Sequence, residues 1–311
     1  MSDPRCVVLA NRSVVRLVGE DTRGFLQGLV SNDINLLATS RSLYAALLTP
    51  QGKYLFDFLL HEAADGAVLL DGERERLPAL IQRLSMYRLR AKVAIEDASA
   101  GKAVLAVLGR EAAGIFDLPP QAGAARVEGD AVLAVDPRTA ELGVRVVLPR
   151  ADLDGFVAAH GLAPAPFAAY DHLRLELGVP DGSRDLVVEK SILLESGFEE
   201  LHGVSFTKGC FVGQELTART KHRGLVKKRL VPVRIEGPVP APGTPVFRGG
   251  RDAGEMRSAL QEAGPGSGAI GLALLRLEQL GPDAAATGPL VAGDAVLIPA
   301  PPPWLQLELH E

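Results

Sequence analysis

Residues 208–215 read Lys208-Gly209-Cys210-Phe211-Val212-Gly213-Gln214-Glu215, and Thr217-Ala218-Arg219-Thr220 follows them. This stretch places one of only two cysteines between glycines and close to a lysine. A neighbouring cation favours the thiolate, and a helix from Val212 to Arg219 would add the positive end of its dipole. Cys210 is therefore a candidate for thiol chemistry. The alternative is a buried cysteine that packs as a small apolar residue.

A basic segment begins at this motif. Between Lys208 and Arg229 the sequence has seven lysines and arginines but one acidic residue, Glu215. Such a local excess predicts a site for a phosphate, a nucleic acid or a carboxylate-rich ligand. The alternative is an ordinary solvated surface. Aromatic residues do not alternate with these cations, which argues against single-stranded nucleic acid as the ligand.

The composition is that of a globular protein with more than one domain. The chain has 311 residues, a length too great for one ordinary core. Of these residues, 47% are apolar and 23% are charged, which is the balance of a globular protein. The net charge of −5 argues against general nucleic-acid binding, so we expect no DNA partner. No stretch approaches the roughly 18 uninterrupted apolar residues of a membrane span, so we expect no membrane partner.

The cysteines and the N-terminus predict a location. Two cysteines are too few for a disulfide framework or for the four thiolates of a conventional iron–sulfur cluster. The histidines show no zinc-type grouping, so we expect no metal site. Residues 1–12 lack the pattern of a secretory signal peptide. These features predict a cytoplasmic protein with reduced thiols.

The hydrophobic pattern predicts an α+β fold with antiparallel sheets. Val7 to Leu17 reads as one strand, and Leu43–Leu48 with Tyr54–Leu60 reads as a hairpin. Phe167 to Leu177 has helical spacing and Gly178 as its stop. After Gly224, short strands separated by Gly and Pro predict a small β-barrel. We expect an α+β region over residues 1–225, in two intertwined lobes with the second at roughly 45–150, and a barrel domain over 226–311.

The motif resembles the signature of the YgfZ family, relatives of the glycine-cleavage T-protein, which is an aminomethyltransferase. The family pattern K-G-C-[FY]-x-G-Q-E matches residues 208–215 throughout, and the superfamily pattern R-x-E-x-G matches Arg174 to Gly178. Phe25-Leu26-Gln27, Ser31-Asn32-Asp33 and Gln51-Gly52-Lys53 also resemble superfamily segments. The resemblance spans roughly residues 12–230.

This resemblance implies a three-lobed T-protein-like fold around a central folate cavity, with tetrahydrofolate or a derivative as the cofactor. It also implies a role in the assembly or repair of iron–sulfur clusters in client enzymes. The expected partners are folate and iron–sulfur client or assembly proteins, and we expect a monomer. Such an accessory protein is not a conventional enzyme, and whether this chain has an enzymatic activity stays open.

The resemblance also assigns roles to individual residues. Glu195 falls where these proteins place a glutamate that faces the pterin ring. Cys210, with Lys208 beside it, would act on iron, sulfide or a partner cysteine. Basic groups would attract the glutamyl carboxylates of folate. The remaining cofactor-binding candidates are Arg174, Arg219, Arg223, Arg229 and Gln214.

Two departures separate this chain from the T-proteins. T-proteins have a pair of aspartates after the hairpin glycine, whereas here Phe56 precedes a single Asp57. T-proteins also lack the cysteine at the position of Cys210. An alternative function is a folate-dependent aminomethyl or one-carbon transferase, in which Asp57 would help to activate the one-carbon centre. A third is a folate-free module that uses the basic segment to bind RNA or a protein.

Overall fold

The structure is a computed structural model that describes residues 4–224, 226–262, 264 and 268–305. Leu225, at the predicted domain boundary, and residues 306–311 of the predicted barrel domain lie outside these ranges. The chain forms two compact units. The first contains Met1–Pro50, Leu55–Tyr170 and Leu201–Gln214, and the second contains Gln51–Tyr54, Asp171–Glu200 and Glu215–Glu311.

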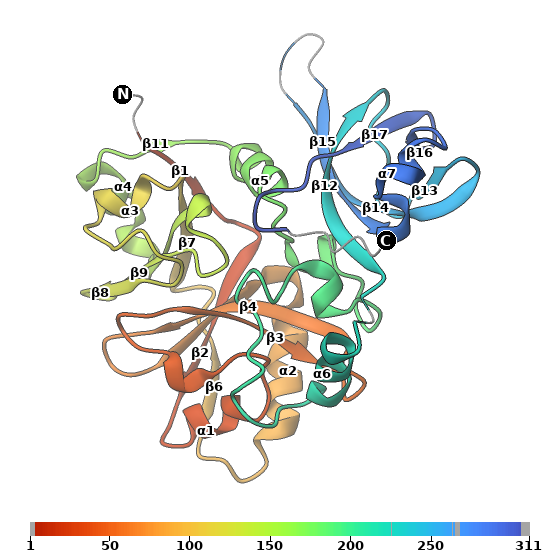
Figure 1. The fold of residues 1–311 in the computed structure, drawn as a ribbon. Helices are drawn as coiled ribbons and strands as arrows, with labels where there is room; N and C mark the ends of the chain where they lie inside the picture. The colour runs from red at the N-terminus through yellow and green to blue at the C-terminus, as the bar shows by residue number, and fades with distance from the viewer. Residues whose placement is uncertain (1–3, 225, 263, 265–267, 306–311) are drawn as a thin grey trace. The chain divides into compact units, whose positions relative to one another are not determined.

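Two sheets build the first unit (Figure 1). Every strand pair with a known register in them is antiparallel except β1 with β11, so the predicted α+β class with antiparallel sheets is confirmed. The five-stranded sheet has the order β3 (Leu43–Leu48), β4 (Tyr54–Glu62), β5 (Val68–Glu73), β2 (Arg12–Val18) and β6 (Ala94–Asp97). The six-stranded sheet has the order β11 (Ala163–Pro164), β1 (Arg5–Val8), β7 (Lys102–Leu108), β10 (Gly143–Pro149), β9 (Ala131–Val135) and β8 (Ala125–Glu128).

The prediction of a single strand from Val7 to Leu17 is wrong, because this segment contains parts of two strands, β1 and β2. The chain turns between β1 and β2, where the amide of Arg12 donates to the carbonyl of Leu9 at 3.0 Å. As a result, β1 pairs in the six-stranded sheet and β2 in the five-stranded sheet. The apolar alternation continues through the turn because both halves are buried, so the pattern alone cannot show the change of sheet.

Short helices complete the first unit. Helix α2 (Leu77–Arg88) has apolar residues at helical spacing and buries Leu77, Leu80 and Leu84. Leu77 and Leu80 lie against β5 at Gly72. The other helices are α1 (Thr22–Gln27), α3 (Ala112–Ile115) and α4 (Leu153–Ala159), while α5 (Phe167–Glu176) continues from the first unit into the second.

The second unit contains a closed six-stranded barrel, as predicted. Its core consists of apolar residues from every strand, including Val231, Val233 and Ile235 of the first. The indole nitrogen of Trp304 donates to the carbonyl of Leu177 at 2.8 Å, which ties the segment after the barrel to the end of α5. The strand order is β12 (Lys228–Glu236), β15 (Ala269–Arg276), β14 (Arg251–Gln261), β13 (Pro245–Arg248), β16 (Leu290–Ala292) and β17 (Ala295–Pro299). The helices of this part are α6 (Gln214–His222) and α7 (Pro282–Ala285).

A buried ion cluster joins the two sheets of the first unit. Arg12 on β2 donates to Asp71 on β5 at 2.7 Å. Arg145 on β10 lies 3.5 Å from the carboxylate of Asp71 and 3.3 Å from that of Asp136. Arg138 donates to both oxygens of Asp136, at 2.9 and 2.7 Å. All five side chains are buried, so each charge depends on the others for compensation.

Replacing Asp136 tests this cluster. Burial would raise the pKa of Asp136, but Arg138 and Arg145 outweigh it and lower the pKa from 3.8 to about 2. The carboxylate therefore stabilises the fold above pH 3.8, and this contribution is lost as the pH falls towards 2. We expect Asp136→Asn to lower the free energy of unfolding by about 3–5 kcal/mol, because two arginines lose their counter-charge in the interior.

Urea unfolding at neutral pH measures that change. Glu141→Gln is the matched control, because it removes an acid from the exposed pair of Arg110 and Glu141. It should cost less than about 1 kcal/mol. Equal effects of the two substitutions would show that the buried cluster contributes no more than a surface pair.

Candidate functional site

The signature loop, Leu201–Gln214, is held by a segment near α1 in the first unit. The hydroxyl of Ser31 donates to the carbonyl of Gly203 at 2.6 Å. The amide nitrogen of the Asn32 side chain donates to the carbonyl of His202 at 2.7 Å. Two side chains from the N-terminal part of the chain thus fix the start of a loop that lies far along the sequence.

Lys208 anchors the middle of the loop. Its Nζ donates to the carbonyls of Val30 and Asn32, at 2.5 and 2.7 Å, and lies 5.1 Å from the centre of the Phe211 ring. Burial lowers the pKa of Lys208 from 10.5 to about 8, although Asp33 acts in the opposite direction. Among the described residues, the hydrogen bonds of this ammonium are to backbone carbonyls and none is to the thiol.

Cys210 is exposed and has a free thiol, so the alternative of a buried, packed cysteine is wrong. The buried thiol is that of Cys6, whose pKa is raised by burial. Gly209 and Gly213 have φ of +95° and +84°, which side chains rarely tolerate, so both glycines are needed for the path of the loop. α6 begins only at Gln214, later than predicted, and Cys210 therefore precedes its first turn.

Gln27 is a site residue to which the sequence reasoning assigned no role. Its side-chain nitrogen donates to Asp33 at 2.9 Å and to the carbonyl of Lys208 at 3.3 Å. Its oxygen accepts from the amide of Ile34 at 2.8 Å. Gln27 and Asp33 lie in the segments Phe25-Leu26-Gln27 and Ser31-Asn32-Asp33, which resemble the superfamily, but only the fold shows that these segments contact the signature loop.

Glu195 lies in the second unit, on the short 3-10 turn Leu193–Ser196. Its carboxyl group is half-buried. Burial raises the pKa of Glu195, against the opposing effect of the nearby cations Lys228, Lys53 and Arg257. No hydrogen bond or ion pair joins this carboxyl group to the residues that the structure describes. A half-buried acid among cations can accept hydrogen bonds from a bound ligand.

Arg229 fixes the turn that carries Glu195. Its side chain is buried on β12 and donates to the carbonyl of Leu194 at 2.8 Å. It also forms an ion pair with Glu200. Arg229, a predicted ligand for folate, is therefore placed to position Glu195 through the backbone.

The other predicted arginines differ in their surroundings. Arg174 is fully buried and pairs with Asp171 at 2.7 Å and with Asp185 at 2.6 Å, and it donates to Ser258 at 2.8 Å. These contacts give Arg174 a role in the scaffold of the second unit. Arg219 is exposed and pairs with Glu215 at 2.9 Å.

Gln214 and Arg223 lie at the two ends of α6. Arg223 is exposed and directly follows the helix, whereas Gln214 is its half-buried first residue. The cations of the basic segment therefore do not share one environment.

Asp57 is buried in β4 of the first unit, where it accepts a hydrogen bond from the hydroxyl of Tyr44 at 3.0 Å. Phe56, which stands in place of the first T-protein aspartate, is also buried and lies 4.3 Å from the guanidinium of Arg76. The first unit thus contains Cys210, Lys208, Gln214 and Asp57, and the second contains Glu195 and the four predicted arginines.

Metal sites and membrane spans are two other features to consider in the described part of the chain. Within the described ranges, no three His, Cys, Asp or Glu side chains are grouped so that they could hold a metal ion. Of the helices that the structure describes, none is both long and apolar enough to cross a membrane.

The titration of Lys208 tests the anchor of the loop. With a folded pKa of about 8 against the usual 10.5, the folded state releases its proton first, so stability rises between these two pH values. We expect Asp33→Asn to lower the pKa of Lys208 further, because Asp33 favours the ammonium. NMR of labelled lysine side chains gives the pKa, with the exposed Asp130→Asn as control. A Lys208 pKa at its usual value would contradict the burial of this ammonium.

The fold has a known counterpart. The crystal structure of the glycine cleavage system aminomethyltransferase T from Bartonella henselae matches with a TM-score of 0.76 at 17% identity, over 98% of this chain and 87% of that chain. A family model described as the C-terminal β-barrel domain of CAF17 matches residues 227–307. The predicted T-protein-like fold with a C-terminal barrel is confirmed, while the folate cavity stays a prediction.

Two curated relatives show the family. The mitochondrial iron–sulfur cluster assembly factor IBA57 of Mus musculus is 38% identical over 294 residues, which cover 88% of this chain and 78% of that protein. The corresponding Homo sapiens protein is 37% identical over 295 residues, with the same shares of 88% and 78%.

The names of these relatives contradict the predicted cytoplasmic location, because both proteins are named as mitochondrial. That prediction used the lack of a secretory signal and of a disulfide framework. Neither feature distinguishes the cytoplasm from another compartment with reduced thiols. At this identity and coverage, the chain belongs to the family of the iron–sulfur cluster assembly factor IBA57.

Proposed function

We propose that this protein is a tetrahydrofolate-binding accessory factor of the YgfZ type, which acts through Cys210 in the assembly or repair of iron–sulfur clusters in client enzymes. The observation that carries the proposal is the exposed thiol of Cys210, on an anchored loop, within a complete match to the family signature. The relatives named as iron–sulfur cluster assembly factors support the same role.

The surroundings of Cys210 suit a thiol that meets a partner. The loop is pinned on one side of the cysteine by Lys208 and on the other by the amide of Val212, which donates to the carbonyl of Gly28 at 3.2 Å. A thiolate can bind iron or attack a sulfur atom. Clusters are usually held by four cysteines, so one thiol here requires ligands from a second protein. A cluster would therefore be a transient cargo shared with a client or assembly protein.

The second unit contains residues that fit folate. Glu195 can accept two adjacent N–H groups from the edge of a pterin ring. Lys53, Lys228 and Arg257, whose charges act on Glu195, can attract the carboxylates of the folate tail. Bound tetrahydrofolate would supply a carrier for one-carbon units. In this proposal Glu195 orients the ring, and Arg229 positions Glu195.

The transferase alternative lacks a supporting observation of its own. It needs Asp57 at the one-carbon centre, but this carboxylate is buried and bonded to the hydroxyl of Tyr44. The likeness to an aminomethyltransferase is at 17% identity and concerns the fold alone. We therefore place the accessory function first.

Replacing the cysteine tests the thiol. In cells that lack the protein, Cys210→Ala and Cys210→Ser should leave the activity of a dependent iron–sulfur enzyme at the level of the deletion, because the thiolate is lost. Cys6→Ala is the control, since it removes the chain's other cysteine, which is buried. Protein levels measured by immunoblot exclude loss by misfolding. Normal enzyme activity with Cys210→Ala would end the proposed role of the thiol.

Calorimetry with tetrahydrofolate tests the cofactor separately. Binding should weaken by roughly tenfold in Glu195→Gln, because a hydrogen bond to a charged group is lost. Glu189→Gln, an exposed change nearby in sequence, should bind as tightly as the unchanged protein. If the unchanged protein does not bind tetrahydrofolate, the folate part of the proposal fails, whatever the cysteine variants do.

A further inference from the structure

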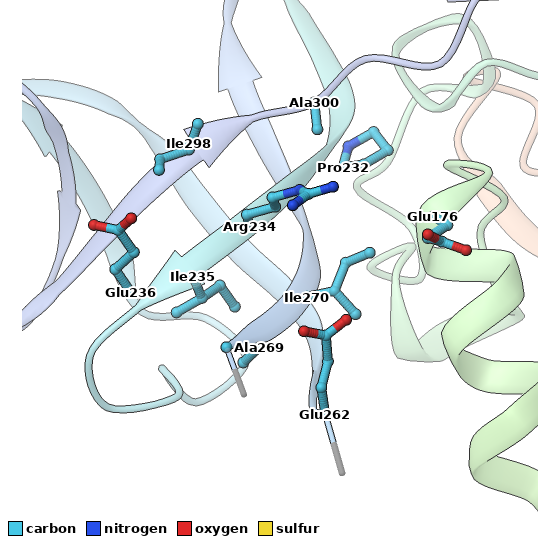
Figure 2. Close-up of a pocket in the computed structure, with 11 residues that line it drawn as sticks. Glu176, Pro232, Arg234, Ile235, Glu236, Glu262, Ala269, Ile270, Ile298 and Ala300 are labelled. Atoms are coloured by element: carbon cyan, nitrogen blue, oxygen red, sulfur yellow. The ribbon is translucent and has the colours of Figure 1, made fainter. Parts of the chain in front are cut away.

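The second unit has a cavity of about 370 Å³ on the outer face of its barrel, beside the end of α5 (Figure 2). Successive residues of a strand point to opposite sides, so the neighbours of Val233 on β12 face outward. The outward residues Pro232 and Arg234 line the cavity. The proposed function uses none of the lining residues.

The cavity continues an apolar surface that α5 covers only in part. Leu175 of α5 packs on the outer face of the barrel in a cluster with Leu230, Ile270 and Leu272. The helix ends at Glu176, and Ile270 lines the cavity beyond this end. The floor of the cavity is therefore apolar and belongs to a packed sheet rather than to a loop.

Arg234 supplies a positive charge above this floor. In the barrel it is paired with Ile270 on one side and with Ile298 on the other. Its side chain is exposed, and it has no hydrogen-bond or ion-pair partner among the described residues. Figure 2 shows its guanidinium directed towards the end of α5, where Glu176 lies.

Two carboxylates lie on that side of the cavity. The ring of His172 is 2.9 Å from Glu262, measured from Nε2 to Oε1, and 3.6 Å from Glu176, measured from Nδ1 to Oε2. Histidine thus connects both acids and restricts their positions. Glu236 also lines the cavity, but Figure 2 shows it at the opposite end, near Ile298.

We propose that this cavity binds a small dipolar ligand, in which a carboxylate and an ammonium group are joined by a short aliphatic chain. The carboxylate pairs with Arg234, the ammonium with Glu176, and the chain lies on Ile270 and Pro232. An anion without the ammonium is repelled by the glutamates, and a cation without the carboxylate is repelled by Arg234. The volume is that of a small-molecule site.

Titrations with 6-aminohexanoate, hexanoate and hexylamine, followed by amide NMR of the full chain, test the proposal. Only 6-aminohexanoate has both charges on an aliphatic chain. The amide chemical shifts that change when 6-aminohexanoate is added should belong to β12, β15 and the end of α5. Each of the other two compounds should bind roughly fivefold more weakly, because each lacks one charge pair. Equal binding of the three compounds, or no localised shifts with any of them, would overturn the proposal.

Two substitutions and a control identify the charges. Arg234→Gln should remove the advantage of 6-aminohexanoate over hexylamine, and Glu176→Gln its advantage over hexanoate. Glu236→Gln is the control, because it changes the net charge by the same amount as Glu176→Gln but at the opposite end of the cavity. It should leave both affinity ratios, of 6-aminohexanoate to hexylamine and to hexanoate, unchanged. If Arg234→Gln preserves its ratio, Arg234 does not bind the carboxylate and the assignment is wrong. The cavity lies within the second unit, so these outcomes do not depend on the cysteine.

Discussion

The buried ion cluster of the first unit is the interaction on which the signature loop ultimately depends. It contains three arginines and two aspartates from both sheets, and a charge left unpaired there would cost several kcal/mol. Arg138 of this cluster lies 5.8 Å from the centre of the Tyr44 ring. Asn32 donates to the carbonyls of both Tyr44 and His202, each at 2.7 Å. A continuous set of contacts thus leads from the charges between the sheets to the loop of Cys210.

The same constraint acts on Lys208 at a smaller scale. A lysine that loses part of its hydration must replace water with other acceptors, and here the carbonyls of Val30 and Asn32 do so. The loop cannot move without exposing those carbonyls and the ammonium to new surroundings. Lys208 therefore holds the backbone of the loop that carries Cys210.

Local sequence patterns predicted the helices, strands and turns whose formation depends on residues close to one another in the chain. The hairpin of β3 and β4, helix α2, the end of α5 shortly before Gly178 and the C-terminal barrel all follow from spacing and turn residues. The short strands β5 and β8 were missed, because Asp71 and Gly72 interrupt the first and Arg126 the second. Arg174 was predicted to meet folate, since its residue type suits an anion. Its partners Asp185 and Ser258 lie far along the chain, and only the fold brings them to it.

The signature also contains one of the places where the chain changes units. Residues up to Gln214 belong to the first unit, and those from Glu215 belong to the second. Gly213, with φ of +84°, lies at this change, so a residue other than glycine would strain the backbone between the thiol and α6. Cys210 and Glu195 are consequently carried by different units, each with its own core. The thiol and the acid proposed to bind folate can then be altered one at a time without removing the scaffold of the other, which makes their contributions separable by substitution.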